Sequence, residues 1–571
     1  MCGFVGYLSG TNRAYNDEAT IQEMMDTIRH RGPDSGGYHV AEGAVLGFRR
    51  LTIIDLSDAG NQPLYDESGR YTLVFNGEIY NHKDIRAELE QKGYHFKSHT
   101  DSEVLVHGYA EWREGILDRV RGMFAFAIWD EQEQSLFLAR DMFGIKPLYY
   151  GKASNDGTFF FGSEIKSFLP HPSFVKEVNK NAVLPYLTFQ YPVTNETFFK
   201  NIYKLEPGTW MRVDADGHMT RKRYWDFEFD ASDESLESYI QQISDVLKDS
   251  VKVHKIADVP VGAFLSGGID SSYITALFKP ENTFSVGFGD YEGRFNETDL
   301  AHRLSEILGF DHHIRLIGAD DFFAALPDIQ YHLDEPQSNL STVPLYFLTK
   351  LASEHVTVVL SGEGADELFG GYESYMRTPH LKLYDRVVPH GVRRGLCKIA
   401  RHLPDNRLTN LMVRGGQTPE EYFIGQAKVF PEEEARAVPR SRRHESRRKD
   451  PDQVPHQGRP FQVCPAQSCP RRAAGGMGPS SEKRFPGTDP RLAATGKILQ
   501  PRQRNLSIAG SRHLLRPGAP ARLSRRPLPG QSPAPALYLH SDVAHPLVPR
   551  VLHQALSSWV NDQFLIPKGH T

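Results

Sequence analysis

The hydrophobic pattern changes twice along the 571 residues, and each change marks a boundary in the predicted fold. Up to about residue 190, apolar and β-branched residues come in short runs that turn residues separate. From residue 236 to about residue 430, such runs alternate with repeats at helical spacing. Beyond residue 430 neither pattern continues. Because a chain of this length is too long for one hydrophobic core, each patterned region predicts a domain of its own.

The first region predicts an α+β domain, residues 1–190, whose antiparallel sheets pack between helices. Sequential strands that few helices interrupt are typical of packed antiparallel sheets. Two helical patterns cover residues 82–92 and 102–112. The predicted strands cover residues 45–56, 71–75, 123–129, 135–139 and 158–161. Residues 191–235 are interpreted as a connector.

The second region, residues 236–430, predicts an α/β domain with a parallel sheet. It opens with Leu236, Ile240, Ile243 and Leu247 at helical spacing. Alternation of strands with helices favours a parallel sheet, and ligands bind such sheets at the carboxyl ends of the strands. The predicted strands cover residues 261–265, 284–288, 313–316 and 356–360, and the helices cover 297–308 and 344–353.

Cysteine content and hydropathy indicate a cytoplasmic location. The chain has four cysteines, which is too few for a disulfide framework. No apolar stretch is long enough to cross a membrane. Residues 431–571 are basic and rich in proline, which suggests a nucleic-acid-binding tail. They lack the aromatic residues and the fold that such binding needs, so we expect neither nucleic acid nor membrane as a partner.

Cys2 is the first candidate catalytic residue. Removal of Met1 would leave it as the N-terminal residue. A free α-amine titrates near neutral pH, so it can take the proton of the neighbouring thiol and activate the nucleophile. A lone cysteine is more often a small buried apolar residue, so this feature alone is weak.

Further motifs follow Cys2 in order. Taken alone, Asn76-Gly77 indicates a hairpin turn, and the run at residues 100–103 indicates a helix cap. Taken together, the motifs resemble the class II glutamine amidotransferase domain. They are Arg-His-Arg-Gly-Pro-Asp at 29–34, Gly-Phe-Arg-Arg-Leu-Thr-Ile-Ile at 47–54, Phe-Asn-Gly-Glu-Ile-Tyr-Asn at 75–81, Thr-Asp-Ser-Glu at 100–103, and the runs at 122–126 and 140–148.

That resemblance implies a role for each residue of the first site. Cys2 would attack the side-chain amide of glutamine and release ammonia. Asn76 and Gly77 would form an oxyanion hole, because both supply N–H donors where negative charge develops. The forked donors of Arg50 would bind the glutamine carboxylate. The implied glutamine-binding residues are Arg50, Leu51, Thr52, Ile53, Ile54, Asn76, Gly77, Glu78 and Asp101, of which Glu78 and Asp101 would bind the ammonium end.

Two glycine-rich loops mark a second site. Phe-Leu-Ser-Gly-Gly-Ile-Asp-Ser-Ser at 264–272 follows a predicted strand and opens a helix, which suits anion binding. It lacks the Gly-Lys-Ser/Thr of the Walker loop. Residues 358–372 repeat the strand–Ser-Gly–acid layout. The first loop resembles the pyrophosphate loop of ATP pyrophosphatases. Together with the Cys2 domain, the pair is similar to the glutamine-hydrolysing asparagine synthetase family.

The family resemblance implies a ligase that uses glutamine, aspartate and ATP with Mg²⁺. ATP would adenylate the aspartate β-carboxylate, and internally transferred ammonia would displace AMP, giving asparagine, glutamate, AMP and pyrophosphate. Asp270 and Asp366 would share Mg²⁺, and Glu363 would contact the activated carboxyl or the ammonia. A homodimer is a further expectation. The implied ATP-binding residues are Leu265, Ser266, Gly267, Gly268, Asp270, Ser271, Ser272, Val286, Ser361 and Gly362.

The resemblance ends near residue 430. The family continues with a lysine-rich segment and a Glu-x-Arg-x-Pro-Phe-Leu-Asp element, and neither is found here. Residues 431–571 are either a disordered fusion or a segment read out of frame. We favour the second explanation because the break falls inside a domain, and it implies little asparagine formation by the chain as written. The alternatives are therefore a glutaminase alone, or an amidotransferase with another carboxylate acceptor. An enzyme that closes an internal amide needs no source of ammonia, so the presence of Cys2 argues against that kind of acceptor.

Overall fold

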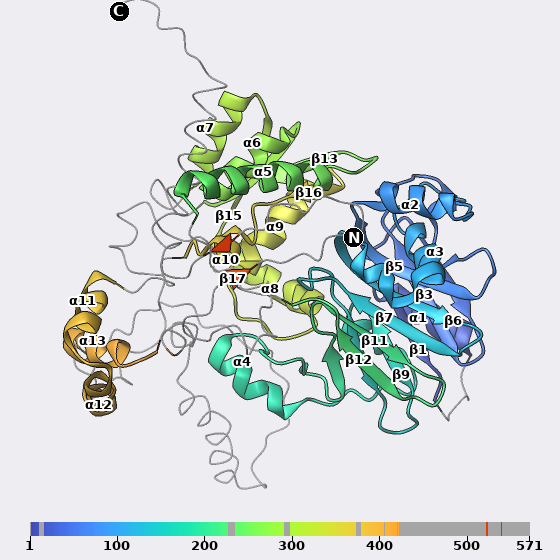
Figure 1. Cartoon of the computed structure of the whole chain (residues 1–571), viewed down its shortest axis with the longest axis horizontal. Coiled ribbons are helices and arrows are strands. Elements are labelled where there is room, and N and C mark those ends of the chain that lie inside the picture. Colours follow the sequence, from blue (N-terminus) through green and yellow to red (C-terminus); the bar gives the residue numbers. More distant parts are fainter. Residues whose placement is uncertain are drawn as a thin grey trace, which may run out of the picture.

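The computed structural model describes residues 2–10, 16–226, 234–289, 297–372, 378–404, 406–418 and 421, and the backbone of two short strands further on. We call the part of the chain up to residue 226 the first half and the part from residue 234 onward the second half. Figure 1 shows the first half, in blue to teal, beside the green and yellow elements of the second half. The predicted tail, 431–571, lies outside the described residues except for those strands. They are β17 (Ala521–Arg522) and β18 (Tyr538–Leu539), which pair antiparallel.

The first half contains two six-stranded antiparallel sheets. The first sheet has the order β10-β8-β9-β1-β3-β2, and the second has the order β12-β11-β7-β6-β5-β4. The strands of the first sheet are β1 (Gly3–Leu8), β2 (Ser35–Val40), β3 (Ala44–Arg50), β8 (Tyr149–Lys152), β9 (Phe159–Gly162) and β10 (Ile202–Lys204). Those of the second are β4 (Leu64–Tyr65), β5 (Tyr71–Ile79), β6 (Gly122–Asp130), β7 (Ser135–Arg140), β11 (Thr209–Val213) and β12 (Met219–Arg223).

Both faces of these sheets are covered. Strand β5 alternates between two cores, since Val74 packs between the sheets while Leu73 and Phe75 pack against α2 and α3. A third core lies between the first sheet and α1. The layer order is therefore helix, sheet, sheet, helices. The helical segments are α1 (Asp17–Asp26), η1 (Asp58–Gly60), α2 (His82–Gln91), α3 (Glu103–Trp112), η2 (Arg113–Asp118), η3 (Ile165–Phe168), η4 (Lys180–Ala182) and α4 (Val183–Phe189).

The second half contains a four-stranded parallel sheet with the order β15-β14-β13-β16. In chain order the strands therefore lie 3-2-1-4, so the winding reverses between β13 and β16. The strands are β13 (Val261–Phe264), β14 (Asn282–Phe288), β15 (Asp311–Ile317) and β16 (Val358–Leu360). The helices are α5 (Leu236–His254), α6 (Ile269–Phe278), α7 (Thr298–Leu308), α8 (Ala319–Leu333), α9 (Thr342–Ser353), α10 (Ala365–Phe369), α11 (Pro379–Val387), α12 (His390–Ala400) and α13 (Arg407–Gly415).

The predicted fold class is confirmed, with three corrections in the first half. The strand predicted at 45–56 ends at Arg50, after which the chain turns into a loop with a positive φ of 56° at Asp55. Asn76-Gly77 lies inside β5 and is not a turn. The predicted connector supplies β10, β11 and β12, so the boundary at residue 190 is too early. Strand β12 was missed because Met-Thr-Arg-Lys-Arg is an exposed edge without apolar alternation.

Candidate active sites in the two halves

Cys2 lies at the start of β1, where the first sheet meets the loop after β3. Its Sγ is 3.4 Å from both the backbone nitrogen and the carbonyl oxygen of Leu51. The side chain packs against the core between the two sheets, which includes Val74 and Ala125. Burial raises the pKa of the Cys2 thiol. An adjacent base is therefore needed to form the thiolate, and a free N-terminal amine fits that need.

Asn76 presents an unsatisfied donor on the same side of β5 as Val74. Its side chain is 1% exposed, and its Nδ2 has no hydrogen-bond partner among the described residues. Buried donors are normally paired, so this one calls for a ligand atom. Gly77 is enforced by packing, because a Cβ there would lie 2.2 Å from the carbonyl oxygen of Met123. Both predicted oxyanion-hole residues are thus held in a strand rather than in a mobile turn.

Two carboxyl groups, those of buried Asp101 and partly buried Glu78, lie near the thiol. The Asp101 Oδ2 atom accepts a hydrogen bond of 2.7 Å from the backbone N–H of Ile79. Burial raises the pKa of Asp101 to about 7, and burial together with Asp101 raises the pKa of Glu78 well above its usual range. Both carboxylates act on the Cys2 thiol electrostatically. They form an acidic pocket that suits a polar, cationic ligand end.

Lys146 is a residue that the sequence analysis did not single out. It is buried, its pKa is lowered by burial, and the charges of Glu78 and Cys2 act on it in the opposite direction. Its backbone N–H donates to Asp141 over 2.9 Å. A lysine within the otherwise apolar run Ile-Lys-Pro-Leu was the available signal. It balances part of the negative charge of the acidic pocket.

Arg50 organises the loop predicted to bind glutamine. Its Nη1 donates to the carbonyl of Ser57 over 2.8 Å, and its Nη2 donates to the carbonyl of Asp55 over 2.5 Å. A Cβ at Gly60 would lie 2.3 Å from Nη2. The guanidinium therefore shapes the loop that contains residues 51–54, and its role toward a glutamine carboxylate stays a prediction.

The two predicted phosphate loops meet at the reversal point of the parallel sheet. One connects β13 to α6, and the other follows β16, the adjacent parallel strand. In the first loop, Ser266 donates its N–H to Ser271 Oγ over 3.1 Å, and Gly267 has a φ of 77°. A Cβ at Gly362 would lie 2.7 Å from the Ser271 backbone nitrogen. Crevices at such reversal points are where open α/β sheets bind ligands.

Carboxyl groups of both loops influence one another. Burial raises the pKa of Glu363 to about 7 and that of Asp366 to about 6, and the charge of Asp270 adds to the shift at Asp366. The described residues contain no cluster of three or more ligands that could hold a metal ion. Mg²⁺ needs only one or two carboxylates when phosphate oxygens complete its shell. Asp270 and Asp366 therefore fit Mg²⁺ held on a nucleotide, rather than a site built by protein alone.

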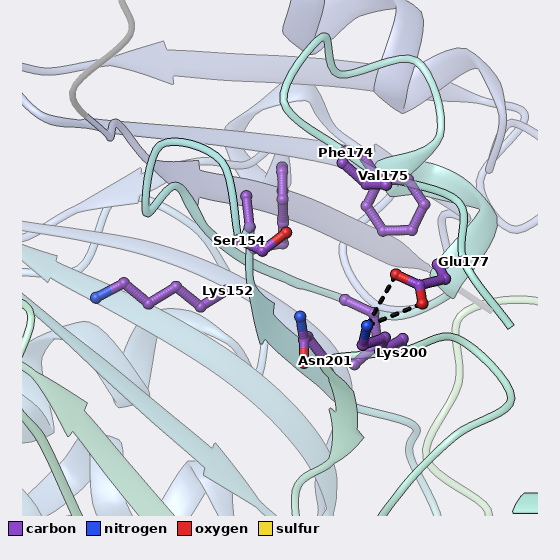
Figure 2. A pocket seen from close by; sticks show the side chains of 10 residues that line it. Lys152, Ser154, Phe174, Val175, Glu177, Lys200 and Asn201 are labelled. Carbon is purple, nitrogen blue, oxygen red and sulfur yellow. Dashed lines mark hydrogen bonds and ion pairs between the residues drawn. The ribbon is translucent and has the colours of Figure 1, made fainter. Parts of the chain in front are cut away.

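Two apolar residues predicted to frame the nucleotide lie beside these loops. Leu265 is buried and donates its N–H to the carbonyl of Phe284 over 2.9 Å. Val286 lies on the neighbouring strand β14. Figure 2 shows a different, small pocket in the first half, where Lys200 and Glu177 form an ion pair of 2.8 Å. It has a volume of about 20 Å³, room for one water, and none of the predicted residues lines it.

Comparison with known proteins decides the family. Residues 1–225 match the glutamine amidotransferase domain, and residues 242–495 match asparagine synthase. Over 439 residues the chain is 41% identical to asparagine synthetase [glutamine-hydrolyzing] 1 of Bacillus subtilis (strain 168), covering 76% of this chain and 68% of that protein. The chain belongs to the glutamine-hydrolysing asparagine synthetase family. It is thus a ligase of asparagine biosynthesis with a glutamine amidotransferase domain.

Other similarities are weaker. Asparagine synthetase [glutamine-hydrolyzing] 3 of Bacillus subtilis (strain 168) is 33% identical over 393 residues, which are 65% of this chain and 63% of that protein. A solved glutamine phosphoribosylpyrophosphate amidotransferase from B. subtilis is 15% identical, covers 55% of this chain and 65% of that chain, and has a TM-score of 0.30. The family match to residue 225 includes β10–β12, and the second match continues to residue 495, beyond the end predicted at 430. Among the described helices, none has the length and apolarity of a membrane span.

Proposed function

We propose that the chain hydrolyses glutamine at Cys2 and uses the ammonia to convert aspartate to asparagine, with cleavage of ATP to AMP and pyrophosphate. The observation that supports this most is the convergence of two Ser-Gly loops, after β13 and β16, at the reversal point of the parallel sheet. The glycine-rich backbone of these loops, which would bind the phosphates, lies beside the carboxyl groups of Asp270 and Asp366. The family's first half supplies the nitrogen, and this crevice would supply the activated acceptor.

In the first site, the amine of a processed N-terminus takes the thiol proton, and the Cys2 Sγ atom attacks the amide carbon of glutamine. The developing oxyanion accepts hydrogen bonds from Asn76 Nδ2 and the Gly77 N–H. Ammonia leaves, and water hydrolyses the thioester to glutamate. Glu78 and Asp101 bind the ammonium end of glutamine. Arg50 and residues 51–54 close the pocket around its carboxylate.

In the second site, Ser266, Gly267, Gly268, Ser271 and Ser272, with Ser361 and Gly362, bind the phosphates of ATP. Leu265 and Val286 border the adenine and ribose. Mg²⁺, when bound by Asp270 and Asp366, would neutralise charge on the pyrophosphate leaving group. Glu363, whose pKa is raised by burial to about 7, would exchange a proton with the incoming ammonia. A cytoplasmic enzyme and a homodimer are parts of the same proposal.

A second candidate is glutamine hydrolysis without asparagine formation. It is favoured by large apolar side chains that the second half exposes, such as Phe323 at 68% and Leu340 at 67%. The two candidates differ when glutamine is replaced by ammonia. The proposal predicts release of pyrophosphate and AMP in equal amounts with asparagine when ammonia, aspartate and ATP are supplied. Absence of pyrophosphate, with intact glutaminase activity, would contradict it and support the second candidate.

A further inference from the structure

A series of four charged side chains, which we call the charged series, leads from the backbone of Cys2 into the second half of the molecule. Arg31 Nε donates to the Cys2 carbonyl oxygen over 2.9 Å, and Arg31 Nη1 donates to Glu164 Oε1 over 2.9 Å. Lys166 Nζ is 2.5 Å from Glu164 Oε2 and 2.9 Å from Asp334 Oδ1. Asp334 follows α8, so the last link belongs to the second half.

The side chains of all four members are nine-tenths or more buried, and their charges alternate in sign. The exposed fractions of the side chains are 10% for Arg31, 9% for Glu164, 3% for Lys166 and 4% for Asp334. Burial raises the pKa of Glu164, but His30, Arg31 and Lys166 together hold it at about 2, so this carboxylate stays ionised. Removing one charge from the charged series leaves the neighbouring charge buried and unpaired. The links therefore respond together to the loss of any one of them.

Arg31 and Asp334, the two ends of the charged series, are held by close contacts. A Cβ at Gly3 would lie 2.8 Å from Arg31 Cδ, so Arg31 packs directly on the residue after Cys2. At the other end, Asp334 has a φ of 61°, which is uncommon for a residue other than glycine. Its Oδ2 accepts a hydrogen bond of 2.7 Å from the backbone N–H of Ile165. Such a backbone conformation persists where its contacts determine it.

We propose that Asp334 is a positioning residue for the glutaminase, which acts through Lys166, Glu164 and Arg31 to hold the Cys2 backbone beside its oxyanion hole. This inference rests on the proposed function of Cys2. It makes glutamine hydrolysis depend on the docked second half, so that ammonia is released only where an acceptor domain is in place.

Glu335 provides a matched control. It follows Asp334 in the same loop, and it also bonds to the first half, where its side chain accepts from the Phe198 N–H over 3.0 Å and from Lys204 over 2.6 Å. It is buried as well, with 8% of its side chain exposed. Its contacts lead away from Arg31. Loss of the Glu335 carboxylate therefore weakens the contact between the two halves without interrupting the charged series that leads to Cys2.

The experiment compares Asp334→Asn with Glu335→Gln in the full chain. We expect Asp334→Asn to lower kcat for glutamine hydrolysis by about 10- to 100-fold, because a small displacement of a nucleophile has an effect of that size, with KM changed less than about twofold. The rate at which a glutamine-mimicking electrophile labels Cys2 should fall in parallel. Glu335→Gln should leave both rates within about twofold of the unsubstituted chain.

A double substitution separates positioning from simple loss of stability. Lys166→Met and Asp334→Asn each interrupt the same charged series. The double variant should therefore hydrolyse glutamine no more slowly than the slower single variant. Equal losses in Asp334→Asn and Glu335→Gln, or full additivity with Lys166→Met, would overturn the inference. An unsubstituted chain that neither hydrolyses glutamine nor becomes labelled at Cys2 would instead overturn the proposed function. The labelling rate, measured on the soluble folded fraction, keeps the comparison informative if a variant is less stable.

Discussion

The two halves of the molecule bury their candidate sites to different degrees. In the first half, the three cores each contain more than ten buried residues, and the Cys2 region packs against one of them. In the described part of the second half, five small clusters contain one to three buried residues each. Large side chains such as Leu300, Ile307 and Val387 stay more than half exposed there. The comparison indicates that the candidate glutaminase site lies in a domain with large buried cores, whereas the predicted phosphate loops lie in a region with small ones.

The largest expected effect belongs to the nucleophile of the first half. Cys2→Ala should reduce glutamine hydrolysis to background, because it removes the proposed nucleophile that forms the thioester. Chemistry that uses supplied ammonia in the second half should continue unchanged. Release of glutamate from glutamine is the measurement. Cys397→Ala is the control, since Cys397 is a buried free cysteine in α12, and it should keep full glutaminase activity. Residual hydrolysis by Cys2→Ala would contradict the assignment.

The difference in core size predicts different responses to truncated side chains. Phe126→Ala in the first half removes a fully buried ring and should lower the free energy of unfolding by about 3–5 kcal/mol. Phe323→Ala on α8 removes a ring that is 68% exposed and should change it by less than about 0.5 kcal/mol. Denaturant unfolding of the two variants tests this contrast. Similar losses for both would mean that the exposed face of α8 is covered in solution.

Catalysis in the first half should depend on the unpaired donor of Asn76. Asn76→Ala should lower glutaminase turnover by about 10²–10³-fold, the usual effect of removing one oxyanion-hole donor. KM for glutamine should change less, because the donor acts on charge that develops in the transition state. Steady-state kinetics measures both quantities. Unchanged turnover would show that another group stabilises the oxyanion.

A smaller effect concerns the pH dependence of stability in the first half. Burial raises the pKa of Glu103, but hydrogen bonds from His107, the Lys97 N–H and Ser98 outweigh it and bring the pKa to about 2. Because the folded pKa lies below the unfolded value of about 4.3, Glu103 stabilises the fold above that pH. This stability is lost as pH falls from about 4.3 to about 2. The difference in unfolding free energy between the unsubstituted chain and Glu103→Gln should shrink across that window, and a constant difference would contradict the prediction.

Local patterns in the sequence predicted the four parallel strands but only part of the antiparallel sheets, where strands such as β1, β2 and β8 were not predicted. The apolar runs of β6 and β7 and the helical repeats of α7 and α9 were placed within about two residues, because their periodicity reflects burial on a sheet or a helix face. What the sequence did not reveal depends on contacts between distant residues. The edge strand β12 has charged residues and joins the sheet only through β11. The strand predicted to run to residue 56 ends at Arg50, because the Arg50 side chain donates hydrogen bonds to the carbonyls of Asp55 and Ser57 and so stabilises a loop.

The same limit applies to the candidate sites. Motif order brought Cys2 and Asn76 into one hypothesis, and the structure adds the reason that Gly77 has no side chain, which is the nearby Met123 carbonyl. Lys146 and the charged series from Arg31 to Asp334 were not predicted. The members of the series come from separate parts of the sequence, and its last pair, Lys166 with Asp334, forms only when the two halves dock.

If the two halves form one enzyme, the amide nitrogen of glutamine should pass from Cys2 to asparagine, and isotope labelling can follow it. The full chain is supplied with glutamine labelled with ¹⁵N in its side-chain amide, unlabelled ammonium, aspartate and ATP, and the asparagine formed is examined for ¹⁵N. We expect labelled asparagine from the unsubstituted chain and only unlabelled asparagine from Cys2→Ala. Labelled ammonium and glutamate without any asparagine would contradict it.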